Sequence, residues 1–312
     1  NITIEGIGED ACVYGFGFLV RNAKSVEFRN LGIMRAMDDG VSLDTDNSNI
    51  WIHHMDLFYG KPGSGDHIKG DGSIDIKTNS KWVTVDHCHF WDTGKTSMCG
   101  MKKESGPNYI TYHHNWFDHS DSRHARVRTM SVHLWNNYYD GCAKYGIGAT
   151  MGSSVFSEGN YFRATKHPIL ISKQGSDAKG MGKFSGELGG MVKEFGSIFA
   201  EKGLGSEYTP ISYADNHESF DFYQATTRRQ QVPSSVKTLN GGSTYNNFDT
   251  DTLLMYRYSP DEAASVPARV TGFYGAGRLN HGALRFKFNN AVEDSNSAPI
   301  PALEALIDAY AK

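Results

Sequence analysis

The feature that most constrains the fold is an apolar pattern that recurs at irregular intervals along the chain. It runs apolar, any, apolar, four residues of any kind, apolar. Copies begin roughly 22 to 33 residues apart. Residues two apart on a strand point to the same side, so each copy opens with an inward-facing pair before a turn and a second strand. The copies are Val26, Phe28, Ile33; Ile50, Ile52, Leu57; Val83, Val85, Phe90; Ile110, Tyr112, Phe117; Val132, Leu134, Tyr139; and Val155 to Phe162, where Ser157 is the only miss.

A unit of roughly 22 to 25 residues, with short strands and no helical pattern between them, predicts one turn of a parallel β-helix. A leucine-rich repeat has a similar period, but its leucine and asparagine consensus is missing. We therefore expect an all-β fold in one domain over residues 1–312. Its coils are clearest over 24–163, and 164–312 adds further coils, loops and a C-terminal cap.

The fifth position after each start suggests a side-chain ladder. The last three copies carry asparagine there, so each amide could bond turn backbone on the neighbouring coil. The alternative is that these are ordinary turn asparagines. From the first copy to the last, the residues are Leu31, Met55, Cys88, Asn115, Asn137 and Asn160.

Two stretched copies predict long loops, at about residues 60–72 and 92–107, that could wall a groove. At the other end of the chain, residues 301–312 have apolar residues at helical spacing: Leu303, Leu306, Ile307 and Tyr310. We expect a short amphipathic helix that covers part of the solenoid, since open coil ends need capping.

Composition excludes several classes of protein. The net charge of -4 provides no global basic field for nucleic acid or an anionic membrane. No apolar stretch is long enough to span a bilayer. The four widely spaced cysteines include no CxxC pair, which argues against zinc but leaves both disulfides and buried thiols open. Asn1 opens directly into a strand-like segment without a signal peptide, so we expect a mature product or a fragment.

Charged residues recur at similar offsets from the coil starts. Asp39, Lys95 and Arg123 each follow a start by 12 or 13 residues, and Asp75 does so once an insertion is removed. Equal offsets stack on adjacent coils about 4.8 Å apart, so we expect these four residues in one column. Asp71 lies four residues before Asp75 and should share its face if the segment is extended.

This column predicts a site for a cation and an anion together. Converging carboxylates repel one another unless a divalent cation joins them, and oxygen ligands favour calcium. Lys95, Arg123 and Arg128 follow directly and suit an anionic polymer. Arg123 and Arg128 are five apart, so a bend near Ala125 is needed to turn both outward. The alternative is that the aspartates cap turns and pair with the cations.

The motifs that contain these residues resemble the polysaccharide lyase family 1 pectate lyases, most strongly over residues 24–163. Each motif alone is weak, and their order and spacing together are specific. Two motifs depart from the family pattern: the usual WIDH is WIHH here, and Ala125 replaces a proline. The matching segments are SNIWIHH (48–54), DGSIDIK (71–77), WVTVDHCHF (82–90), KTSMCG (95–100), YITYHHNWF (109–117), RHARVR (123–128), VHLWNNYYD (132–140) and EGNYF (158–162).

The resemblance implies a secreted enzyme, extracellular or periplasmic, with a right-handed single-stranded parallel β-helix and a calcium cleft. The substrate would be polygalacturonate, cleaved by β-elimination to 4,5-unsaturated products, and we expect a monomer with no nucleic acid or membrane partner. By position in the motifs, Arg123 would be the proton-abstracting base, and Lys95 and Arg128 would bind substrate. The Ca²⁺ ligands would be Asp39, Asp71 and Asp75, with Asp38 as an additional candidate. Family members normally have several dozen residues, including a cap, before the point where this sequence begins.

Three other functions remain as alternatives. A pectin lyase would need no calcium, and a glycosidase would need paired carboxylates and an activated water. A non-catalytic polysaccharide-binding β-helix would have no reason to bring Lys95 to Arg123. Most of the histidines are expected to be structural turn residues, with His124 as the exception because it is next to the proposed base. The histidines considered are His54, His87, His89, His113, His114, His119, His124 and His133.

Overall fold

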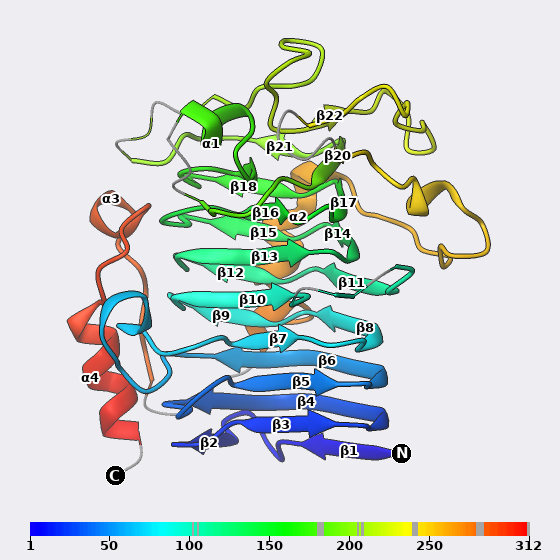
Figure 1. Cartoon of the computed structure of the whole chain (residues 1–312). Helices are drawn as coiled ribbons and strands as arrows, with labels where there is room; N and C mark the ends of the chain where they lie inside the picture. The colour runs from blue at the N-terminus through cyan, green and yellow to red at the C-terminus, as the bar shows by residue number, and fades with distance from the viewer. Residues whose placement is uncertain are drawn as a thin grey trace.

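The chain forms a parallel β-solenoid whose coils stack along one axis, from β1 near the N-terminus to β22 (Figure 1). The computed structural model describes residues 1–101, 103–104, 106–179, 184–204, 206, 209–238, 243–278 and 284–310. All strand pairings in the two sheets are parallel. The predicted parallel β-helix is therefore confirmed.

Two sheets of different size enclose the core. The smaller sheet has 7 strands: β3 (Phe18–Arg21), β5 (Val41–Thr45), β7 (Ile74–Ile76), β10 (Lys95–Cys99), β13 (Ser122–Arg128), β16 (Ile147–Thr150) and β19 (Ile169–Ile171). The larger sheet has 15 strands: β1 (Ile2–Glu5), β2 (Cys12–Tyr14), β4 (Lys24–Met34), β6 (Ser48–Leu57), β8 (Lys81–Asp86), β9 (His89–Trp91), β11 (Ile110–His113), β12 (Trp116–Asp118), β14 (Ser131–Trp135), β15 (Tyr138–Asp140), β17 (Ser154–Glu158), β18 (Tyr161–Arg163), β20 (Met191–Phe195), β21 (Ile198–Phe199) and β22 (Tyr223–Gln224).

The apolar frame read from the sequence is the register of the larger sheet. Ile50 pairs with both Val26 and Val83, and Phe90 pairs with both Leu57 and Phe117. These side chains are buried in one continuous core between the sheets. The only miss, Ser157, is also buried, and its hydroxyl accepts a hydrogen bond from the Asn160 amide at 3.0 Å.

The predicted asparagine ladder is confirmed. The Asn115 amide donates to the Asn137 carbonyl oxygen at 3.0 Å, and the Asn137 amide donates to Asn160 at 3.1 Å. The side-chain oxygens also accept from backbone, as Asn115 does from the Cys88 N–H at 3.0 Å. Each of these groups is buried, so the ladder satisfies amides that water cannot reach.

The coils extend beyond the copies recognised in the sequence. At the N-terminal end, Ile2 pairs with Val26, and at the other end Val192 pairs with Val155. The later coil is hidden in the sequence by a long insertion and by the buried Glu194 at the second inward position. The predicted loop at 92–107 is wrong in part, because strand β10 lies within it and the long connection is 100–109.

The helices cover the sides of the solenoid. Helix α4 (Pro301–Tyr310) buries Leu303 and Ile307 against Met34, Phe58 and Tyr59. It therefore covers part of the solenoid, as predicted, but on the flank of the first coils rather than at an open end, as Figure 1 shows. The prediction of a helix at this place is confirmed over residues 301–310, and residues 311–312 lie outside the described part.

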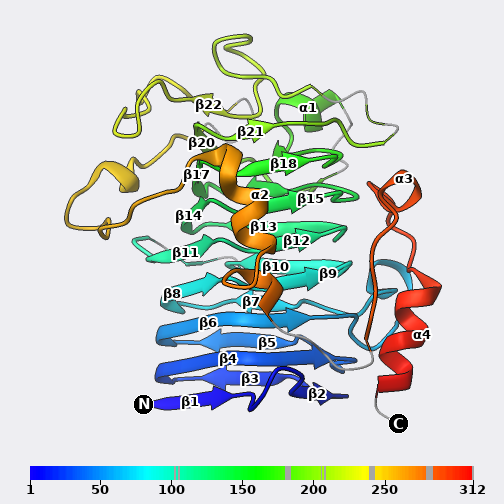
Figure 2. The ribbon, with the colours of Figure 1, turned by 180° about the vertical axis from the view of Figure 1, so that it is seen from behind.

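The remaining helices are short. Helix α2 (Val266–Thr271) packs Val266 and Val270 against Tyr138 on the back of the larger sheet (Figure 2). The others are α1 (Gly175–Lys179) and α3 (Asn290–Glu293), with short 3₁₀ turns η1 (Gly65–His67), η2 (Phe248–Thr250), η3 (Ala263–Ser265) and η4 (Ala276–Arg278). Within the described residues, no helix has the length and apolarity needed to cross a membrane.

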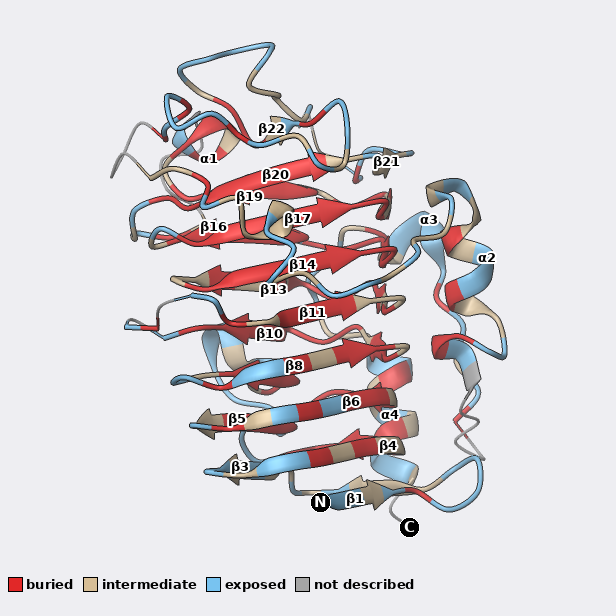
Figure 3. Ribbon diagram, turned by 90° about the vertical axis from the view of Figure 1, so that its right-hand side faces the viewer, coloured by how far each residue is buried: buried red, intermediate tan, exposed pale blue. Residues whose placement is uncertain are grey.

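Burial is uneven along the solenoid. Figure 3 shows strands of the middle coils almost wholly buried, whereas β1, β3 and β4 have exposed segments. Ile2 and Leu19, in the first coil, are each 60% exposed. Among the cysteines, all of which are described, none forms a disulfide, and Cys88, Cys99 and Cys142 are buried thiols.

Candidate active site

The predicted site residues lie on four neighbouring strands of the smaller sheet or, for Asp39 and Asp71, just before two of them. These strands, β5, β7, β10 and β13, are consecutive in the sheet and come from successive coils. In the view of Figure 1, no helix lies over this face of the sheet. On this face Asp71, Arg123 and Arg128 are partly exposed, whereas Asp39, Asp75 and Lys95 are buried.

The single column expected from equal offsets is wrong in its detail. Lys95 pairs with Ser122 on one side and with Gly72 on the other. Asp75 lies three residues further along its strand and pairs with Ser42. The offset count failed because the length of the inserted loop before β7 was assumed. Lys95 and Asp75 are therefore on adjacent strands, but they lie at different positions along the strand direction and not in one column.

Three carboxylates converge beside the start of β5 and β7. Oxygen atoms of Asp38, Asp39 and Asp71 all lie within 4.8 Å of one another. Calcium binds oxygen ligands at about 2.3–2.6 Å, so two oxygens on opposite sides of one ion are about 5 Å apart. The donor set and its spacing fit Ca²⁺, and Asp38 belongs to the group with Asp39 and Asp71.

Asp75 lies next to this group and is almost fully buried. A Cβ at Gly72 would be 2.7 Å from carboxylate oxygens of both Asp39 and Asp75, so only glycine lets the two converge. Burial, and then the charge of Asp39, raise the pKa of Asp75 to about 7. Lys77 partly balances these charges, with its ammonium 2.5 Å from Asp39 and 3.5 Å from Asp75. The site holds more negative charge than Lys77 neutralises.

Lys95 connects the acidic group to the first long loop. Its ammonium lies 3.3 Å from carboxylate oxygens of both Asp71 and Asp66, and 2.7 Å from His67 Nε2. Asp66 and His67 belong to η1 in the loop between β6 and β7. This loop therefore borders the charged face, as the sequence predicted for residues 60–72.

A buried ion-pair cluster anchors the same loop. Lys69 has a fully buried side chain, and its ammonium lies 2.5 Å from Asp92 and 2.7 Å from Asp121. Burial raises the pKa of Asp92 to about 7 despite the neighbouring ammonium. Lys69 thereby holds Asp66, His67 and Asp71 over the sheet.

Arg123 has no hydrogen bond or ion pair within the described part of the chain. Its backbone is left-handed, with φ of 66°, which is uncommon for a side chain of this size. A register shift between Ser97 and Met98 places an extra residue, Ala125, in β13. This bulge supplies the bend predicted near Ala125 and turns Arg123 and Arg128 to the same partly exposed face.

The other end of the charged face holds two paired arginines. Arg126 and Arg128 each lie 3.0 Å from Glu187 Oε2. The pairing anchors the loop after α1 at the edge of β13. Among the described residues, Arg123 is thus a guanidinium without an ion pair, between the acidic group on one side and two arginines that share one carboxylate on the other.

Several residues at the site were not identified from the sequence. Lys77 follows Asp75 by two residues on one strand, so alternation could have placed it on the same face. Arg126 could have been assigned to this face only if the bulge at Ala125 had been known. Asp66, His67 and Glu187 come from loops whose approach has no signal in the sequence.

His124 does not lie in this site, contrary to the expectation from its position next to Arg123. It is fully buried, donates from Nδ1 to the Tyr145 carbonyl at 2.9 Å and packs on Phe117. Burial lowers its pKa to about 3. His54, His87 and His114 occupy left-handed turn positions, as expected for structural histidines.

Comparison with known proteins identifies the family. A family model described as pectate lyase matches residues 1–277. The chain belongs to the pectate lyase family. Pectate lyase A of Emericella nidulans is 31% identical over 56% of this chain and 55% of its own length. A pectate trisaccharide-lyase of Bacillus licheniformis is 29% identical over 54% of this chain and 50% of its own.

Solved pectate lyases share the fold. Pectate lyase C of Erwinia chrysanthemi, whose structure was determined with Ca²⁺, superposes with a TM-score of 0.59 at 23% identity, covering 91% of this chain and 73% of that one. The chain spans about half the length of the curated pectate lyases it matches.

Proposed function

We propose that the protein is a pectate lyase that cleaves α-1,4-polygalacturonate by calcium-dependent β-elimination. The observation that carries the proposal is the placement of a carboxylate cluster beside an unpaired Arg123 on neighbouring strands of an uncovered sheet. Family membership supports the reaction class. We propose Asp39, Asp71 and Asp75 as Ca²⁺ ligands, with Asp38 added because its oxygen lies within the same 4.8 Å group.

In this proposal the residues of the chain divide the work. Arg123 takes the proton from C5 of a galacturonate, and the C5–H electrons pass into the adjacent carboxylate as enolate-like charge. These electrons form the C4–C5 double bond as the C4–O bond breaks, and the departing oxygen keeps the C4–O electron pair and gains a proton from solvent. Lys95 and Arg128 bind substrate carboxylates. A bound Ca²⁺ would supply positive charge to the carboxylate next to C5, where negative charge develops.

The partner-free state of Arg123 supports its role as the base. A carboxylate in contact with a guanidinium favours its protonated form, and among the described residues Arg123 forms no such ion pair, whereas Arg126 and Arg128 pair with Glu187. A guanidinium has an intrinsic pKa above about 12, so the reactive neutral form is scarce near neutral pH. Turnover should therefore rise toward alkaline pH, and a flat profile from neutral to about pH 10 would exclude Arg123 as base.

The decisive experiment measures ultraviolet absorbance of the unsaturated product on polygalacturonate, with and without a calcium chelator. We expect absorbance that grows with calcium and stops on chelation, because the unsaturated end forms only by elimination. New reducing ends without absorbance would indicate a hydrolase instead. Faster, chelator-resistant cleavage of methyl-esterified polymer would indicate a pectin lyase.

We further propose that the protein acts as a secreted monomer, since a polymeric substrate cannot cross a membrane. Detection in the culture medium or periplasm of its source, and light scattering of the purified chain, test the two statements. Retention in the cytoplasm or a stable dimer would contradict them.

A further inference from the structure

Three neighbouring coils of the larger sheet end in paired polar residues, away from the charged face. His53 within β6 and the strand-end residues Asp86 of β8 and His113 of β11 pair across these strands, which face the viewer in Figure 3. Each is followed by a histidine in the turn, and these turn rings stack at 5.0 Å, His54 on His87 and His87 on His114.

The middle pair and one neighbour bring three donors together. His87 Nδ1 is 2.5 Å from Asp86 Oδ1, and His113 Nε2 is 3.9 Å from Asp86 Oδ2. One ligand atom from each of the three lies within 4.8 Å of the others. The side chains of His87 and His113 are 24% and 19% exposed, and that of Asp86 is 5% exposed.

A chain of hydrogen bonds leaves one of these donors without a proton. Asp261 lies 3.1 Å from His114 Nε2 and so takes its N–H. Neutral His114 must then accept at Nδ1 from His113 Nδ1, 3.0 Å away. His113 Nε2 is 3.9 Å from Asp86 Oδ2, too far to donate a hydrogen bond to the carboxylate. His113 Nε2 therefore has a lone pair that faces the Asp86 carboxylate.

Two acceptors facing each other repel unless a cation joins them. The Trp51 indole N–H donates to Asp86 Oδ2 at 2.5 Å, which fixes the carboxylate, as His114 fixes His113. Such outer partners are typical of metal-binding histidines and carboxylates. Ligands of tetrahedral zinc at about 2.1 Å lie about 3.4 Å apart, a value between the two observed separations.

We propose that Asp86, His87 and His113 bind a divalent transition-metal ion, with zinc as the expected occupant. Two imidazoles and one carboxylate suit zinc, in contrast to the all-oxygen group of Asp38, Asp39 and Asp71. The ion replaces the proton that His87 Nδ1 now donates to Asp86, and this proton leaves to solvent. The bound ion would link strand β8 of one coil to strand β11 of the next, so zinc binding should also raise the melting temperature.

The test is zinc titration of protein without a histidine tag, in competition with a chromogenic chelator. We expect one site per chain and a higher melting temperature with zinc. Asp86→Asn and His113→Gln should each weaken binding by roughly 100-fold or more. His217→Gln, on an exposed histidine elsewhere, and Asp39→Asn, in the acidic group, are matched controls that should leave zinc affinity unchanged.

X-ray absorption of the wild-type protein with one equivalent of zinc provides a readout that does not depend on variants. Two imidazoles in the coordination shell are expected. Absence of a saturable site, a shell with fewer than two imidazoles, or full affinity in a folded His113→Gln variant would overturn the proposal.

Discussion

Arg123 combines a left-handed backbone with an unpaired guanidinium. Backbone strain of this kind costs about 1–3 kcal/mol and persists only where the surrounding structure enforces it. Here the bulge at Ala125 and the pairing of β13 with β10 enforce it. A residue placed at such cost, without a partner to stabilise it, is a strong candidate for contact with substrate.

Arg123→Lys tests this role. Lysine keeps the positive charge, but its ammonium differs in shape and basicity, so we expect turnover to fall by roughly 10²- to 10⁴-fold. Polymer binding should remain within a few-fold of wild type. Arg126→Lys is the control, because Arg126 lies on the same strand but is ion-paired with Glu187. Comparable turnover in the two variants would remove Arg123 from the mechanism.

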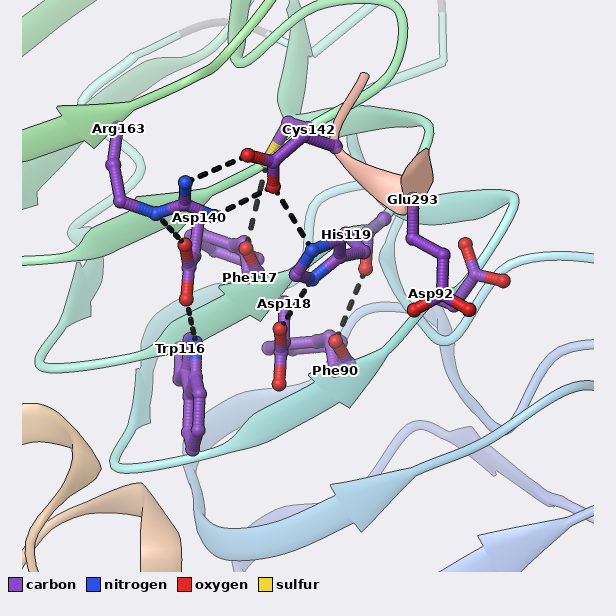
Figure 4. Close-up of polar contacts among 12 residues, drawn as sticks. Phe90, Asp92, Trp116, Phe117, Asp118, His119, Asp140, Cys142, Arg163 and Glu293 are labelled. Atoms are coloured by element: carbon purple, nitrogen blue, oxygen red, sulfur yellow. Dashed lines mark hydrogen bonds and ion pairs between the residues drawn. The ribbon is translucent and has the colours of Figure 1, made fainter. Parts of the chain in front are cut away.

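His119 predicts how stability changes with pH. It lies 2.6 Å from Asp118 and 3.0 Å from Asp294. Figure 4 shows His119 with Asp118, beside the Arg163–Asp140 pair. Burial lowers its pKa, but the carboxylates outweigh burial and raise the pKa to about 10. A histidine pKa raised above about 6.5 contributes stability that is complete below pH 6.5 and is lost by pH 10.

The free energy of unfolding should therefore decline between pH 7 and 10. Denaturant titrations at several pH values measure it. Asp294→Asn should lower stability overall and flatten the decline, because the His119 pKa falls. An unchanged slope in this variant would contradict the assignment. Alkaline conditions that favour the proposed base would thus also weaken the fold.

At the scale of strands and loops, the sequence predicted the features that repeat from coil to coil. The inward apolar frame and the ladder of Asn115, Asn137 and Asn160 recur coil by coil, so the pattern contained their register. The single charged column failed because it depended on an insertion length and on a bulge. The insertion and the bulge each occur in one coil only, so neither produces a repeating pattern in the sequence. The approach of Glu187 was unpredictable for the same reason.

The loop between β6 and β7 depends on one buried side chain, that of Lys69. Lys69→Met would leave Asp92 and Asp121 with too little positive charge, and we expect a loss of about 3–5 kcal/mol in unfolding free energy. Calcium affinity should fall as well, since Asp71 belongs to this loop. Lys61→Met, on an exposed lysine of the same loop, is the control. Equal stability of the two variants would show that the cluster does not anchor the loop.

At the scale of the whole molecule, each coil contacts its neighbours in the stack. Stability in such an array is a sum of coil and interface contributions, so the end coils should open first. Hydrogen exchange followed by mass spectrometry should find fast exchange in β1–β3 and slow exchange in β11–β17. The exposure of Ile2 and Leu19 supports this order. Uniform protection along the stack would contradict it.

In the coils from β4 to β21, the turn between the two strands of the larger sheet contains one left-handed residue, whereas residues 6–11 join β1 to β2 in the first coil. The left-handed residue is Asn30, His54, His87, His114, Asn136, Gly159 and Gly196 in successive coils. The long connections 58–73, 100–109 and 172–190 all leave at the other two corners. Evolution can thus lengthen or replace the loops around the charged face while the short left-handed turn preserves the register between coils. Related enzymes could acquire new substrate preferences in this way without moving the aspartates relative to the arginine.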